Sequence, residues 1–129
     1  MSVRENRIPD LSVLDPRDID RMLGGDGCGW VCEVDDRIVG FAMADLSKAN
    51  VYALFVEPAF EGRGIGRRLH DTMMRWFFDR GIPEVWLSTD PNTRAEAFYR
   101  RAGWTAAGTR ANGEIRFTLS RERWLANTP

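Results

Sequence analysis

The sequence has little cysteine and histidine, and this scarcity limits the metal and thiol chemistry that it supports. Cys28 and Cys32 are its two cysteines, and His70 is its one histidine. A four-ligand zinc site needs more of these side chains. A catalytic Cys–His pair needs both groups in contact, and nothing in the sequence indicates that contact. We therefore expect no metal site and two reduced thiols, at least one of them in the core.

Long apolar runs and an excess of one charge are also lacking. No apolar run approaches the roughly 20 residues of a membrane span, and the N-terminal stretch MSVRENRIPD is charged, without the apolar middle of a signal peptide. These absences predict a cytoplasmic protein without a membrane partner. The net charge is −1, so there is no global electrostatic case for a nucleic-acid partner. A chain of 129 residues fits a single domain, residues 1–129.

Apolar periodicity and turn residues predict a mixed α+β fold. Two apolar runs flank Asp35-Asp36, which indicates a hairpin. The third strong run, residues 50–58, is apolar almost throughout and predicts a central strand covered on both faces. Weak alternation at residues 2–7 is typical of a short edge strand, and Asp15-Pro16 begins a short helical pattern. Further strands are expected at EVWLST, WTAAGTR and EIRFTLS, with a turn at Ala111-Asn112-Gly113 between the last two.

Two longer helices follow the third strand. The first has an apolar stripe that indicates core packing, and Gly81 ends it. The second has Thr93 and Glu96 at the spacing of a capping box, and Gly103 as its C-terminal stop. The apolar stripe of the first helix consists of Leu69, Met73, Trp76 and Phe77.

Three glycines stand immediately before the first of these helices, in the stretch EGRGIGRR. Glycine is costly at a helix start unless the backbone there must approach something closely. A helix N-terminus with bare N–H groups suits a phosphate. The nucleoside-triphosphate loop is excluded because it needs Gly-Lys-Ser/Thr, and the dinucleotide fingerprint fails because Arg67 and Leu69 stand where glycine is required. Two interpretations of the glycines remain at this point: a third kind of phosphate-binding loop, or a turn that needs glycine for its backbone conformation alone.

Two blocks of the sequence, ALFVEPAFEGRGIGRRLHDTM and STDPNTRAEAFYRRAGW, resemble the GNAT superfamily of N-acetyltransferases. The second block carries that family's pattern of Asn92, a seven-residue step to Tyr99, and then Gly103-Trp104. The likeness covers about residues 29–119. It implies a GNAT-like fold with a central mixed, mostly antiparallel sheet flanked by helices, and here a shortened N-terminal helical region. It also implies acetyl-CoA as cosubstrate and direct acetyl transfer to a primary amine of a small molecule or peptide.

The resemblance also implies roles for individual residues. The backbone of Leu54, Phe55 and Val56 would pair with the pantetheine arm, and one N–H there would stabilise the oxyanion. Asn92 would hydrogen-bond the same arm, although a turn residue or helix cap is an equal reading of the local pattern. Tyr99 would protonate the leaving thiolate, against the alternative of a half-buried helix aromatic. The residues that would hold the pyrophosphate are Gly62, Arg63, Gly64, Ile65, Gly66 and Arg67.

The general base is where the sequence departs from the family. Some relatives place a glutamate at the position of Leu87, which cannot accept a proton. Glu57, at the end of the third strong strand, is the candidate base, against a solvated carboxylate as its alternative, and Asp45 is a poorer option. Glu61 stands where the family often has glutamine or arginine, so a side-chain phosphate contact is not expected there.

Two other readings compete with the enzyme. A non-catalytic acyl-CoA sensor or partner domain of the same fold is favoured by the lack of an obvious base, whereas Tyr99 favours catalysis. A nucleic-acid module using GRGIGRR is disfavoured by the near-neutral charge. The turn at Asn112-Gly113, with Arg110, Glu114 and Arg116, is expected to border the acceptor site, and edge strands near both ends are compatible with a homodimer.

Overall fold

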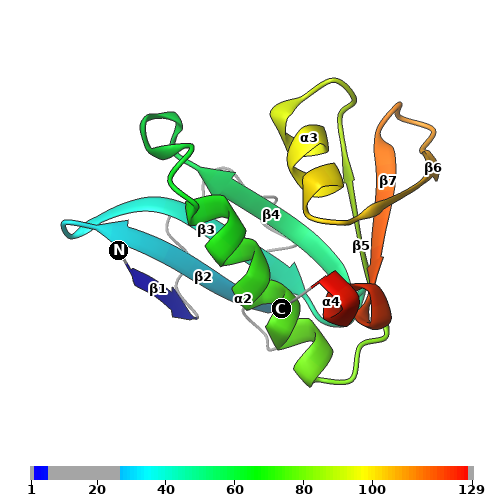
Figure 1. Cartoon of the computed structure of the whole chain (residues 1–129), viewed down its shortest axis with the longest axis horizontal. Coiled ribbons are helices and arrows are strands. Elements are labelled where there is room, and N and C mark those ends of the chain that lie inside the picture. The colour runs from blue at the N-terminus through cyan, green and yellow to red at the C-terminus, as the bar shows by residue number, and fades with distance from the viewer. Residues whose placement is uncertain (1, 6–26, 128–129) are drawn as a thin grey trace. The chain divides into compact units, whose positions relative to one another are not determined.

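The computed structural model describes residues 2–5 and 27–127, which fall into two compact units, residues 1–77 and 78–129. The expected helix at residues 15–23 lies outside the described residues, as does the expected shortening of the N-terminal helical region. Each unit contains antiparallel strands and helical segments (Figure 1). Among the helices of the described segments, none is long and apolar enough to span a membrane.

The first unit is an antiparallel sheet in the order β1-β2-β3-β4. Its edge strand β1 pairs with β2, which confirms the edge strand expected near the N-terminus. The hairpin between β2 and β3 turns at Asp35-Asp36, with φ of 52° and 63°. Positive φ at both positions is the conformation of a type I′ turn, whose twist matches that of the strands. The strands are β1 (Ser2–Glu5), β2 (Gly27–Val34), β3 (Arg37–Asp45) and β4 (Asn50–Val56).

Helix α2 (Ile65–Asp79) packs across one face of this sheet (Figure 1). A Cβ built on Gly40 would lie 3.1 Å from Leu69 Cδ1 and 3.2 Å from Ile65 Cγ2, so glycine lets the helix approach β3 closely. Trp30 of β2 meets Trp76 edge to face, with ring centroids 5.4 Å apart. These contacts confirm the apolar stripe as core. Both cysteines are buried, and no disulfide joins them.

Strand β4 differs from its prediction. Its apolar sequence predicts burial on both faces, yet only Val51 is buried and Phe55 is 48% exposed. The reason is local. Phe55 lies opposite Phe41, on the sheet face away from Gly40 and α2, so the helix covers only the other face. An apolar run in the sequence does not show whether other elements of the fold cover one face of the strand or both.

The second unit is a three-stranded antiparallel sheet in the order β5-β7-β6, with α3 against one face. Val85, Leu87, Phe117 and Leu119 form its buried face, and Tyr99 of α3 packs on Phe117 with ring centroids 6.4 Å apart. The C-terminal helix α4, which the sequence does not predict, buries Trp124 near Phe78. The elements are β5 (Glu84–Thr89), α3 (Arg94–Arg101), β6 (Thr105–Thr109), β7 (Ile115–Ser120) and α4 (Arg121–Asn127).

Candidate active site

The predicted site residues fall into two groups, one in each unit. The end of β4 and the glycine loop belong to the first unit, whereas Asn92 and Tyr99 belong to the second. The structure therefore describes the surroundings of each group separately.

A β-bulge re-registers β4 just before the predicted pantetheine segment. Ala44 pairs with Val51, but Met43 pairs with Ala53, so Tyr52 is the extra residue. An unbroken ladder would place Leu54 opposite Phe41, whereas the bulge places Phe55 there. Bulges bend the strand that carries them and are frequent beside functional sites. The backbone of residues 54–56 thus follows a local bend.

The glycine loop joins a short 3₁₀ helix, η3 (Pro58–Phe60), to α2. Gly62 and Gly64 have φ of 78° and 80°, a conformation that favours glycine. A Cβ at either position would meet no atom within 4 Å, so the backbone borders open space. Arg68 N–H bonds the carbonyl of Gly64 at 3.0 Å. The N–H groups of residues 65–67 precede this bond and have no carbonyl partner within the helix.

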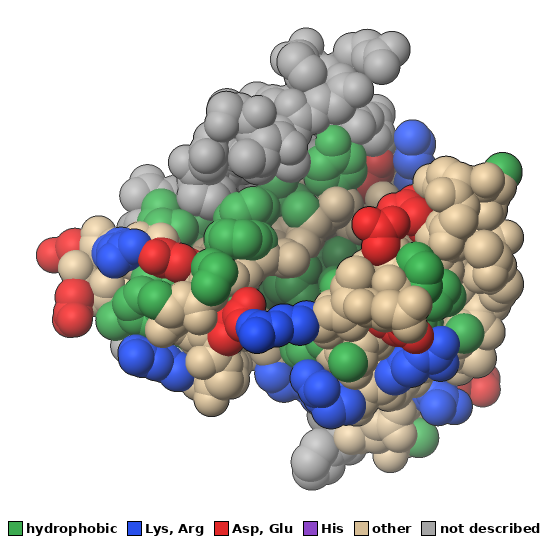
Figure 2. All heavy atoms as spheres, turned by 90° about the horizontal axis from the view of Figure 1, so that it is seen from above, with side chains coloured by type: hydrophobic (Ala, Val, Ile, Leu, Met, Phe, Trp, Pro, Cys, Tyr) green, Lys and Arg blue, Asp and Glu red, His purple; other side chains and the backbone are tan. Residues whose placement is uncertain are grey.

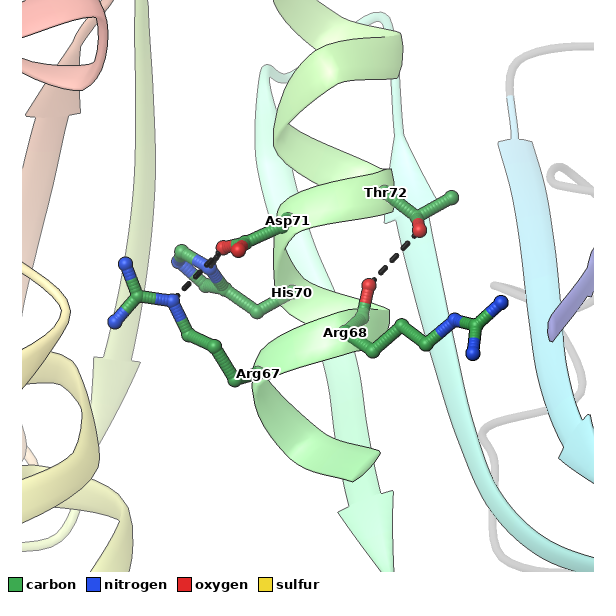
Figure 3. Close-up of polar contacts among 5 residues, drawn as sticks. All are labelled: Arg67, Arg68, His70, Asp71 and Thr72. Atoms are coloured by element: carbon green, nitrogen blue, oxygen red, sulfur yellow. Dashed lines mark hydrogen bonds and ion pairs between the residues drawn. The ribbon is translucent and has the colours of Figure 1, made fainter. Parts of the chain in front are cut away.

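Two arginines near this loop are held by neighbours. The guanidinium carbon of Arg63 lies 4.8 Å from the Phe60 ring centroid. Arg67 Nε donates to Asp71 Oδ1 at 3.0 Å, and His70 Nδ1 lies 2.8 Å from the same oxygen (Figure 3). Figure 3 also shows that the Arg68 side chain extends from the other side of the helix. Arg67 is thus oriented by Asp71.

His70 is fully buried, and burial lowers its pKa despite the opposing contact with Asp71. Burial opposes ionisation of Asp71, but His70 and Arg67 outweigh it and lower the pKa of Asp71. A neutral His70 therefore donates Nδ1–H to an ionised Asp71, which in turn accepts from Arg67. Asp71 therefore connects the buried His70 with Arg67 in the first turn of α2.

Lowering the pH from 7 to 5.5 is expected to destabilise the protein through His70. Its pKa in the folded state lies below the usual 6.5, so the unfolded chain takes up this proton first, and stability falls as pH drops below about 6.5. The loss is at most about 1.4 kcal/mol per pH unit. Asp71 titrates at lower pH, outside this window.

Urea unfolding of the wild type and of His70→Gln at both pH values measures this effect. The variant is expected to lose less stability than the wild type over the same interval. An equal loss in both proteins would assign the pH dependence to other groups.

Glu57 follows β4 and is paired with an arginine of the neighbouring strand. Its carboxylate accepts from Arg37 Nη2, and its N–H donates to the carbonyl of Val39 at 2.7 Å. Its side chain is 28% exposed. The contact with Arg37 involves Oε1, so Oε2 is the oxygen that would accept a proton. Sequence reasoning missed Arg37, because the bulge sets which residues of β3 lie beside Glu57.

Asn92 precedes Thr93, the N-cap of α3, and has a left-handed conformation with φ of 61°. Thr93 Oγ1 accepts from Glu96 N–H at 3.2 Å, which confirms the predicted cap. The reciprocal bond differs in detail, because Glu96 Oε1 accepts from the N–H of Asn92, at 2.7 Å, rather than from that of Thr93. This N–H and then Arg100 lower the pKa of Glu96.

Tyr99 is buried on the inner face of α3, among aromatic rings. Its ring centroid lies 5.5 Å from that of Trp104 and 5.2 Å from that of Phe98. Burial raises the pKa of its phenol, so the hydroxyl keeps its proton at neutral pH. Leu87, at the position where some relatives carry glutamate, is buried in the same unit and pairs with Phe117.

Charges of both signs are interspersed on the molecular face of Figure 2, where acidic and basic side chains lie close together. No group of three or more potential metal-ligating side chains occurs within residues 2–5 and 27–127.

The sequence profile of the acetyltransferase (GNAT) family matches residues 3–104, which is more than half of the 129-residue chain. The chain belongs to the GNAT family. This result confirms the resemblance seen in the two sequence blocks.

Curated relatives of this GNAT chain include an uncharacterised N-acetyltransferase of Methanocaldococcus jannaschii, 35% identical over 86 residues. That match covers 58% of this chain and 38% of the relative. The ribosomal protein bS18 alanine N-acetyltransferase of Salmonella typhimurium is 33% identical over 81 residues, covering 60% of this chain and 55% of that one. The chain thus spans about half or less of the length of these relatives.

A solved structure confirms the fold class. The PaiA N-acetyltransferase of Thermoplasma acidophilum, in complex with coenzyme A, matches with a TM-score of 0.71 and 18% identity. The match covers 81% of this chain and 67% of that one. At this identity the likeness establishes the GNAT fold, and no more.

Proposed function

We propose that this protein is an acetyl-CoA-dependent N-acetyltransferase that transfers the acetyl group directly to a primary amine. The observation that carries the proposal is the glycine loop. Gly62 and Gly64 leave open space before the N-terminus of α2, where N–H groups without helical partners and the positive end of the helix dipole favour a phosphate. A pyrophosphate fits this cradle, which a side chain would narrow.

The neighbouring residues suit the rest of such a cosubstrate. Arg63 and Arg67 would supply positive charge near the phosphates, each held in place by a contact of its own. The backbone of Leu54, Phe55 and Val56 would pair with the pantetheine arm. Asn92 would add a side-chain hydrogen bond to that arm, because its exposed amide stands before α3.

Tyr99 would act as the general acid. In the reaction the neutral amine nitrogen forms a bond to the acetyl carbon, the carbon–sulfur bond breaks, and sulfur leaves with the electron pair. The reference pKa of a phenol, about 10, is near enough to that of a thiolate, about 8.5, for proton transfer to this leaving group. Burial raises the pKa of Tyr99 and makes its phenol a weaker acid, which works against this donation. The amine proton must leave separately, by a base or through water.

Glu57 is the proposed base, with a water chain as the other route. Glu57 is ion-paired with Arg37 through Oε1, a contact that suits a structural carboxylate as well as a base. That same observation favours a second candidate function, an acyl-CoA sensor that binds the ligand and catalyses nothing.

The sensor and the enzyme are distinguished by two measurements on the wild type. Calorimetry tests binding of coenzyme A, and a thiol-release assay with acetyl-CoA tests turnover across a panel of amines and peptide N-termini. Binding with amine-dependent thiol release supports the enzyme. Binding without release from any acceptor supports the sensor, and no binding refutes both.

We also propose that residues 1–129 form one acetyltransferase domain, since the family match runs through both units. The cytoplasmic location and a homodimer remain predictions. Sedimentation velocity of the purified chain tests the homodimer.

A further inference from the structure

One face of the β5–β7 ladder carries Trp86, and two arginines from later in the chain lie over its ring. Trp86 and Ser88 alternate with buried Leu87, and they pair with Thr118 and Arg116. The guanidinium carbon of Arg116 lies 5.2 Å from the Trp86 ring centroid, and that of Arg110 lies 5.5 Å from it. Cation–π contacts at such distances hold the two guanidinium groups over the ring.

Arg110 is balanced by a carboxylate on the β6–β7 turn. Its Nη1 donates to Ser88 Oγ at 3.0 Å and lies 3.7 Å from Glu114 Oε1. The same oxygen of Glu114 accepts from Ser88 Oγ at 3.1 Å and from Asn112 Nδ2 at 2.7 Å. Glu114 therefore anchors the turn and neutralises Arg110.

Arg116 has no such balance. Within the described segments of the chain, no carboxylate forms an ion pair with Arg116, and its guanidinium lies over the Trp86 ring. The residue is half-buried. A partly desolvated guanidinium without a counter-charge favours an incoming anion, and the stacking orients its planar fork before the anion binds.

We propose that Arg116, supported by Trp86 and Arg110, binds a carboxylate on the amine acceptor. This inference rests on the proposed acetyltransferase function and narrows its substrate class to amines that also carry a carboxylate. Such an acceptor is a small amino acid or a peptide with an acidic residue near its N-terminus.

The location of this cluster within the second unit agrees with that role. Arg116 and Ser88 project from the face opposite Leu87 and Phe117, and Tyr99 packs on Phe117. The predicted acid and the anion-binding arginine therefore belong to opposite faces of one ladder. An acceptor held at Arg116 therefore does not occupy the face on which Tyr99 packs.

The test compares acceptors that differ only in charge. 4-Aminobutyrate is paired with 4-aminobutanamide, and the dipeptide Ala-Glu-amide with Ala-Gln-amide. The wild type is expected to show a kcat/KM about 10- to 100-fold higher for the carboxylate member of at least one pair. The pair that responds distinguishes a small amino acid from a peptide.

Arg116→Gln is expected to remove that preference and to change kcat/KM for the neutral member less than about threefold. Arg116→Lys keeps the charge without the fork and is expected to retain part of the preference. Arg101→Gln, an exposed arginine of α3, is the matched control and keeps the full preference. Equal activity on both members of each pair, a preference for polyamines, or an equal loss on both members in Arg116→Gln would overturn the proposal.

A binding measurement separates this inference from the proposed function. Chemical-shift titration of ¹⁵N-labelled protein with 4-acetamidobutyrate, against 4-acetamidobutanamide, needs no turnover. Selective binding that Arg116→Gln abolishes supports the anion site even if no acceptor is acetylated. Failure of both ligands to bind selectively refutes the anion site, while amine-dependent thiol release would still support the enzyme.

Discussion

Replacing Tyr99 with phenylalanine is expected to lower the rate of acetyl transfer by about 100-fold or more, because general acid catalysis contributes roughly 10²- to 10⁴-fold. The buried ring and its contacts with Trp104 and Phe117 are retained in the variant, so the loss comes from the hydroxyl. Affinity for coenzyme A is expected to stay within about threefold of the wild type, because the proposed phosphate cradle is elsewhere in the chain.

Tyr52→Phe is the matched control, since Tyr52 is the other tyrosine of the chain. Thiol release under saturating acetyl-CoA and calorimetry with coenzyme A are measured on all three proteins. If Tyr99→Phe and Tyr52→Phe transfer acetyl groups at the wild-type rate, Tyr99 is a packing residue and the proton comes from another source.

Gly64→Ala is expected to weaken coenzyme A binding by about 10- to 100-fold, the range of one or two lost hydrogen bonds to a charged group. Two effects combine. The new Cβ enters the open space that the phosphates would fill, and the backbone at φ of 80° becomes strained for a residue other than glycine. Relaxation of that strain shifts the N–H groups at the start of α2.

Gly81→Ala is the control that distinguishes a loss of coenzyme A binding from a general effect of backbone strain. Gly81 has φ of 82° and open space around its Cβ position, so it carries the same conformational penalty outside the proposed site. Both variants are expected to lose about 1–2 kcal/mol of unfolding free energy. Only Gly64→Ala is expected to bind coenzyme A more weakly, and an equal or absent effect on binding in both variants would contradict the cradle.

Local signals predicted most of the fold. The turn at Asp35-Asp36, the cap at Thr93 and the glycine stop at Gly81 depend on residues within a few positions of one another. The two sequence blocks also located the glycine loop and Tyr99 on the expected elements. Turns, helix caps and glycine stops can be predicted from a sequence because each of them is formed by only a few residue types.

The features that escaped prediction depend on register and on contacts between distant residues. The bulge at Tyr52 decides that Phe55 lies opposite Phe41, and no residue type marks such a bulge. The pairing of Glu57 with Arg37 and the stacking of Arg116 on Trp86 follow from register as well. Helix α4 was missed because RERWLANTP has a single large aromatic and little periodicity.

The bond between Glu96 and the N–H of Asn92 ties two properties of the protein together. One carboxylate both completes the start of α3 and holds the peptide group of a proposed ligand-binding residue in its left-handed shape. If Asn92 binds the pantetheine arm as proposed, it would need little reorganisation, which would reduce the entropic penalty of association. Shortening Glu96 to aspartate would then loosen the helix and lower ligand affinity in the same step.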